Sequence, residues 1–176
     1  MSAPRCGRCR TSIGVALRDR PNRRGEFMIW TPKNIPARKP GWERSFVAIM
    51  ARHVATPFAW TPDAHCLAAP AELCLAMTGV DPMRGFRRYR TETGALRAMK
   101  AAGFGTVEDA LAATFLEIPK LLARRGDCGV LAQEVDSRPW LTSFVVMGAM
   151  AVGKTERGPV YVPVEALKRT FAIGAY

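Results

Sequence analysis

Apolar side chains recur every three or four residues in the first compact part of the chain. One helical face would carry Trp42, Phe46, Ile49, Met50 and His53. This spacing predicts a helix over about residues 41–54 that buries that face. Pro57 ends the segment, because the residue before a proline disfavours helical backbone. His53 then lies near the end of the helix and is expected to be a core or boundary histidine.

A second helix is predicted after an aromatic, turn-rich stretch. Its apolar positions include Leu67, Leu73, Cys74 and Met77, and it stops at Gly79, a residue suited to a left-handed C-cap. Pro70 must lie in the first turn, where its missing N–H costs nothing, so the helix begins near residues 67–69. Cys66 is therefore expected at the N-terminus of this helix, and Asp63 is expected to cap it.

Two shorter helices should follow. Residues 93–102 form the first, with Leu96 and Met99 turned inward, and glycines end it. Thr106 is expected to cap the second. Its apolar stripe consists of Val107, Leu111, Phe115 and Ile118, and Pro119 closes it.

The pattern changes from helical to extended after Gly126-Asp127. We expect Asp127 to cap a turn or to pair with Arg124 or Arg125. Apolar and β-branched runs bounded by glycine and proline predict strands at residues 128–133, 140–147, 160–164 and 171–173, with one helical turn within 163–169. Helices first and a small antiparallel sheet second make an α+β domain.

Composition adds a boundary to this picture. The chain has 176 residues, 48% of them hydrophobic, which is enough for one domain with a real core. Ten of the first 39 residues are Lys or Arg, against only Asp19 and Glu26. We therefore assign residues 1–39 to a basic, proline-containing arm and residues 40–176 to the domain. No apolar run is long enough to span a bilayer.

Charge and cysteine content narrow the function classes. The formal charge of +11 predicts attraction to an anionic partner. The five cysteines are odd in number and irregularly spaced, which favours reduced thiols. Cys6 and Cys9 have the spacing of a metal knuckle, but a zinc site needs two more ligands, so free thiols are the favoured interpretation. We expect no cofactor.

The order of motifs resembles that of small NlpC-like, papain-fold proteins encoded beside tail-tip genes of long-tailed phages and gene transfer agents. The residues that carry the resemblance are Pro57-Phe58-Ala59-Trp60, Cys66, Thr78-Gly79-Val80-Asp81-Pro82, Arg88-Tyr89-Arg90-Thr91-Glu92-Thr93-Gly94-Ala95-Leu96-Arg97, Gly126-Asp127 and Val162-Pro163-Val164-Glu165-Ala166-Leu167. The resemblance extends from about Trp42 to Ile173.

The resemblance implies a cysteine peptidase-like fold in which Cys66 is the nucleophile and a histidine on the second strand is the general base. The chemistry would be hydrolysis of peptidoglycan stem peptides through a thioester. Aligning Gly148 with the glycine that ends this strand puts Thr142 at the histidine position, and no histidine follows His65. Threonine cannot accept a thiol proton near neutral pH. His65 and His53 are the remaining candidates for a base.

Three hypotheses follow. The favoured one is a degenerate, non-catalytic tail-tip protein that docks on tail-tip or hub proteins. The second is an active peptidoglycan endopeptidase that uses Cys66 with His65 or His53. The third, a nucleic-acid-binding accessory protein, rests on charge alone. In the first two cases the protein is made in the host cytoplasm and is then carried in the virion.

Overall fold

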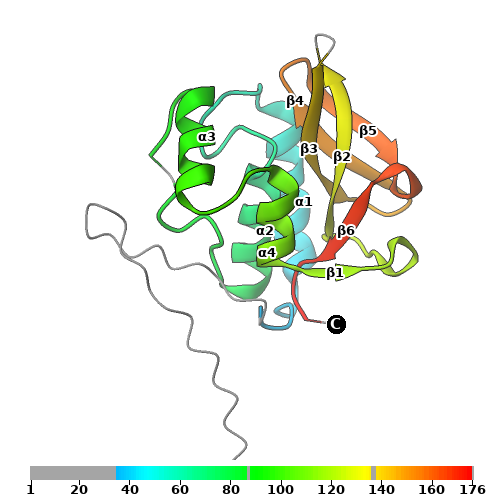
Figure 1. The fold of residues 1–176 in the computed structure, drawn as a ribbon. Coiled ribbons are helices and arrows are strands. Elements are labelled where there is room, and N and C mark those ends of the chain that lie inside the picture. The colour runs from blue at the N-terminus through cyan, green and yellow to red at the C-terminus, as the bar shows by residue number, and fades with distance from the viewer. Residues whose placement is uncertain (1–34, 87, 136–137, 176) are drawn as a thin grey trace, which may run out of the picture.

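The computed structural model describes residues 35–86, 88–135 and 138–175. Four α-helices precede all six strands of an antiparallel sheet, so the fold is α+β with helices first, as predicted. Helices lie against one face of the sheet (Figure 1). Among the described residues, no helix is long and apolar enough to cross a membrane.

The first two helices form where the apolar spacing predicts them. Helix α1 (Trp42–Ala55) buries Phe46, Ile49, Met50 and His53. Helix α2 (Ala68–Thr78) ends at Gly79, whose φ of 86° is left-handed. The expected cap by Asp63 is wrong: Leu67 is the N-cap residue and no side chain caps it. An extra turn in the loop separates Asp63 from the helix start.

The next two helices differ more from expectation. Helix α3 (Glu92–Ala101) has no buried residue, and Leu96 is 45% exposed instead of turned inward. Thr106 does cap helix α4 (Val107–Thr114), through a capping box with Asp109. The helix stops at Thr114, since Phe115 is extended and strand β1 (Leu116–Ile118) pairs with β6. Pairing with a distant strand thus overrides the local helical pattern.

The strands have the order β1-β6-β2-β3-β4-β5. Their bounds are β2 Cys128–Val135, β3 Arg138–Val146, β4 Met150–Thr155, β5 Gly158–Pro163 and β6 Arg169–Ala172. Sequence patterns did not predict β1 or β4. Single 3-10 turns occur at η1 (Lys120–Leu122) and η2 (Val164–Ala166).

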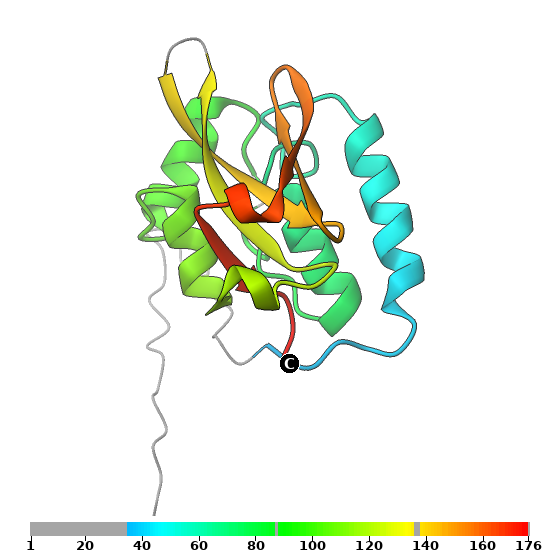
Figure 2. The same cartoon turned by 90° about the vertical axis from the view of Figure 1, so that its right-hand side faces the viewer.

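The sheet is divided into two hairpins that splay apart. Strand β3 pairs with β2 over all eight residues of β2, but with β4 only over Phe144–Val146. In Figure 2 the β2–β3 hairpin and the β4–β5 hairpin diverge from this short contact. Trp60 contacts both hairpins. Its ring packs edge-on against Trp140 of β3, with the ring centroids 5.6 Å apart, and its Nε1 donates to the Glu156 carboxylate in the β4–β5 turn at 3.1 Å.

Two apolar clusters hold the layers together. The larger one joins α1 and α2 to the sheet through residues such as Phe46, Leu73, Val145 and Val152. Phe144 and Val146 belong to a smaller cluster that also contains Val164 and Leu167 from the η2 turn. Because neighbouring residues of a strand face opposite ways, Leu141, Ser143 and Val145 of β3 face the helices, whereas Thr142, Phe144 and Val146 face the smaller cluster.

Residues 35–39, which the sequence assigns to the arm, lie against the domain. Ile35 is buried in the core. Arg38 donates to the buried carboxylate of Asp127 at 2.5 Å and to the carbonyls of Arg125 and Ile173. The same carboxylate accepts the Arg124 N–H, which confirms that it caps a turn. The rest of the basic arm lies outside the described residues.

Candidate functional site

Cys66 lies at the head of α2, in contact with the centre of the sheet. Its backbone carbonyl accepts the Ser143 hydroxyl of β3 at 2.7 Å. Burial raises the pKa of the Cys66 thiol, although hydrogen bonds from the Ser143 backbone and side chain and from the Leu67 N–H lower it in part. The thiol is therefore protonated at neutral pH, which is the weakly nucleophilic form.

Ser143, and not Thr142, is the β3 residue that faces Cys66. Thr142 is buried on the opposite face of the strand, with Phe144 and Val146. The expectation that Thr142 pairs with Cys66 is therefore wrong, because Ser143 is the residue that lies there. The chemical consequence is the same, because a serine hydroxyl does not accept a proton from a thiol near neutral pH either.

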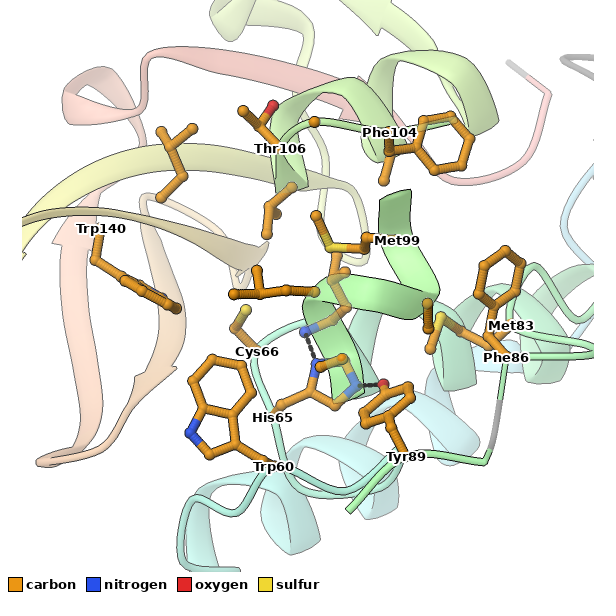
Figure 3. A pocket seen from close by; sticks show the side chains of 18 residues that line it. Trp60, His65, Cys66, Met83, Phe86, Tyr89, Met99, Phe104, Thr106 and Trp140 are labelled. Atoms are coloured by element: carbon orange, nitrogen blue, oxygen red, sulfur yellow. Dashed lines mark hydrogen bonds between the residues drawn. The ribbon is translucent and has the colours of Figure 1, made fainter. Parts of the chain in front are cut away.

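His65 is buried beside Cys66, and its ring is committed to other partners. Nδ1 accepts the Leu67 N–H at 3.2 Å. A neutral imidazole then carries its proton on Nε2, which donates to the Tyr89 hydroxyl at 2.5 Å (Figure 3). His65 thus anchors the loop before α2 to the segment around Tyr89, and no ring nitrogen remains to deprotonate the neighbouring thiol.

His53 is buried in α1, outside the set of residues that line the pocket at Cys66. Burial, together with the charge of Lys154, lowers its pKa to about 4. Lys154 of β4 is itself buried, and burial lowers its pKa. Its Nζ has no hydrogen-bond partner among the described residues. His53 is therefore affected by the charge of Lys154 and does not line the pocket at the Cys66 thiol.

A pocket of about 310 Å³ opens directly beside Cys66. Apolar side chains form most of its wall (Figure 3): Trp60, Met83, Phe86, Leu96, Met99, Phe104, Trp140 and Leu141. Tyr89, His65 and Thr106 add polar atoms. The volume is at the lower end of the range of about 300–1,000 Å³ for ligand pockets.

The chain segment that supplies much of the pocket lining is rich in basic residues. Residues 83–105 contain six arginines and lysines and a single acidic residue, Glu92. A second hollow shares Leu96, Met99 and Phe104 with the pocket and adds Lys100. The basic and aromatic run 83–90 marks this segment in the sequence. The helical spacing of Leu96 predicted a buried side chain, so its exposure was missed.

Metal chemistry finds no support within the described residues. No group of three or more His, Cys, Asp or Glu side chains there could hold a metal ion. Cys66, Cys74 and Cys128 are free and buried. The candidates Cys6 and Cys9 lie outside the described residues.

The chain was compared with curated proteins, solved structures and protein-family profiles. No curated protein and no solved structure matches the chain. One protein-family profile matches residues 37–173, which include every described helix and strand and all the pocket residues named above. The chain belongs to this family, which is described as a domain of unknown function (DUF6950).

Proposed function

We propose that this chain is a non-hydrolytic subunit of a phage-like tail tip, built on an NlpC-like variant of the papain fold. The motif order in the sequence supports the family relation. A cysteine at the head of a helix, packed on the central strand of an antiparallel sheet, is the arrangement that such a fold uses for its nucleophile. The proposal is that this arrangement is kept and its catalysis is lost.

One observation carries the non-hydrolytic part of the proposal: the β3 residue that faces Cys66 is Ser143, whose hydroxyl donates to the Cys66 carbonyl. A cysteine hydrolase needs a base within hydrogen-bond reach of the thiol. The ring nitrogens of His65 are directed to Leu67 and Tyr89. The raised pKa of the Cys66 thiol removes the alternative of a thiolate that forms without a base.

The proposal is tested with purified muropeptides. Wild type and Cys66→Ala are incubated with peptidoglycan fragments, and new amine termini are counted by mass spectrometry. Neither protein should release any. Cys74→Ala is the matched control, since it removes another buried thiol, from within α2. Cleavage by wild type and Cys74→Ala, but not by Cys66→Ala, would establish the active endopeptidase instead.

Thiol reactivity gives an independent test of the same point. Because burial raises the pKa of the Cys66 thiol, iodoacetamide should label Cys66 in the native protein no faster than Cys74, whose pKa burial raises to about 11. Labelling is followed by mass spectrometry from pH 6 to pH 9. Selective alkylation of Cys66 below pH 8 would contradict the proposal.

A further inference from the structure

We propose that the pocket beside Cys66 binds an extended, acidic segment of a partner protein, with one large apolar side chain of that segment in the pocket and its backbone paired with Leu141. The inference rests on the proposed function, because a non-hydrolytic tail-tip subunit acts through its protein partners. Three features of the described residues support it: the pocket wall, an unpaired strand edge and the local charge.

The pocket wall selects an apolar group. Trp60, Phe86, Met99 and Phe104 present rings and a thioether, and few polar atoms face the space between them. A polar ligand would lose its hydrogen bonds to water there without replacement. Methionine and aromatic side chains adapt to apolar groups of different shape. A phenylalanine, leucine, methionine or tryptophan side chain meets these requirements.

The strand edge selects a peptide as the carrier of this group. The Val146 N–H points to β2, where it donates to the Asp127 carbonyl at 2.8 Å. By alternation, the N–H and C=O of residues 145, 143 and 141 point to the other side of β3. Val145 pairs with Val152 of β4 there, and Ser143 meets Cys66. Leu141 is left with no backbone hydrogen bond to any described residue on that side.

The geometry of strand pairing links these two features. Residues directly opposite each other on paired strands place their side chains on the same face. The Leu141 side chain lines the pocket. A peptide residue paired with Leu141 would therefore direct its own side chain into the same pocket. Backbone pairing would supply affinity and the pocket would supply specificity.

The charge of residues 83–105 selects an acidic segment. Arg84, Arg90, Arg97 and Lys100 are exposed and have no ion-pair partner within the described chain. Each is a chain neighbour of a residue that lines the pocket, and Lys100 lines the adjoining hollow, so Asp and Glu residues that flank the apolar anchor would lie next to these side chains. A nucleic acid would satisfy the charges as well, but its base edges would lose their hydrogen bonds in the apolar pocket. An acidic peptide satisfies both the pocket and the rim.

The experiment uses the full chain and fluorescein-labelled nonapeptides, with binding followed by fluorescence anisotropy. The central residue is Phe, Leu, Met or Trp, and the flanks are Asp and Glu. Two matched sets replace the flanks by Lys or the centre by Ala. At least one acidic peptide should bind about tenfold or more tightly than both counterparts, because it alone has the anchor and the charge.

Two changes test the details of the pose. N-methylation of the central peptide amide leaves the protein untouched and should weaken binding about fivefold through the loss of one hydrogen bond. Lys100→Glu should weaken binding of the acidic peptides about fivefold, while Arg44→Glu, the same charge change on the exposed face of α1, should not. Circular dichroism confirms that both variants are folded.

The outcomes separate this inference from the proposed function. Equal binding of the acidic, lysine-flanked and alanine-centred peptides, or binding of none, overturns the inference and leaves the non-hydrolytic proposal intact. Cleavage of a bound peptide by wild type but not by Cys66→Ala overturns the proposed function and leaves the pocket assignment intact. Displacement of the peptides by short single-stranded DNA, with a steep salt dependence, would assign the basic segment to nucleic acid.

Discussion

Two buried side chains of opposite charge, at the two ends of the sheet, have very different surroundings. Asp127, at the start of β2, accepts hydrogen bonds from Arg38 and from the N–H groups of Arg124 and Ile173. Lys154, near the end of β4, has no hydrogen-bond partner among the described residues. A buried group left in this way costs about 1–3 kcal/mol. The hydrogen bonds at the Asp127 end therefore stabilise the fold, whereas the buried Lys154 ammonium at the other end lowers the free energy of unfolding.

The costly end is also the end that carries the pocket and Cys66. Thr142, whose hydroxyl is buried without a hydrogen-bond partner in the described chain, lies in the same part of β3. His53, held neutral by burial, is affected by the charge of Lys154. Unsatisfied polar groups in a native protein call for an explanation, and functional regions are where they concentrate. The comparison thus distinguishes the hydrogen-bonded Asp127 end of the sheet, which stabilises the fold, from the Lys154 end, which we interpret as a functional region.

The largest effect is expected from Asp127→Ala. The change leaves the Arg124 and Ile173 N–H groups and the Arg38 guanidinium without their acceptor, so it should lower the free energy of unfolding by about 3–5 kcal/mol. Urea denaturation measures this. The matched control is Asp109→Ala, which breaks the exposed capping box of α4 and should cost about 1 kcal/mol. An equal loss in the free energy of unfolding for the two variants would show that the Asp127 hydrogen bonds do not stabilise the fold more than an exposed helix cap does.

The next effect is a loss of stability in mild acid that originates at His53. The pKa of His53 is about 4 in the folded protein and 6.5 in the unfolded chain, so the unfolded chain binds the proton more readily. The stabilisation is present above pH 6.5 and is lost as the pH falls to 4. It amounts to about 3 kcal/mol.

Urea denaturation at a series of pH values checks this, with His53→Gln for comparison. The variant has no titrating ring and should show a flatter dependence on pH between 6.5 and 4.5. An unchanged slope in the variant would assign the acid sensitivity to other groups. That result would also mean that the two ends of the sheet differ less than their hydrogen bonds indicate.

The smallest effect is a gain. Lys154→Met replaces a buried ammonium by an apolar chain of similar length and should raise the free energy of unfolding by about 1–3 kcal/mol. It also removes the positive charge near His53, so the pKa of His53 should rise, which NMR titration measures. Lys168→Met, at an exposed lysine paired with Glu108, should change stability by at most about 1 kcal/mol. A loss of stability in Lys154→Met would show that the ammonium is satisfied in solution.

Local patterns were sufficient for α1, α2 and the caps at Gly79 and Thr106, because spacing, proline and glycine act within a few residues. They failed where distant pairing decides. Residues 115–118 continue a helical stripe, yet pairing with β6 makes three of them a strand. Strand β4 has Gly153 and Lys154 in its interior, and both weaken a strand signal.

The candidate site shows the same limit at the scale of one residue. Gly148 lies beyond the end of β3, in the turn to β4, so counting back from it does not fix which face a residue occupies. A slip of one residue moves a side chain to the other face of the sheet. This is why Thr142 was expected where Ser143 lies. The position of Cys66, in contrast, followed from Pro70 alone and is confirmed by the start of α2.

The short contact between β3 and β4 has a mechanical consequence. The outer ladders of the two hairpins contain eight and six residue pairs, and only three pairs join the hairpins to each other. A force that pulls the hairpins apart is resisted by these three pairs, by Trp60, and by the two apolar clusters that contain side chains of both hairpins. The β2–β3 and β4–β5 hairpins are therefore more strongly paired within themselves than with each other. We expect tension between them to separate β3 from β4 first, next to Trp60 at the edge of the pocket.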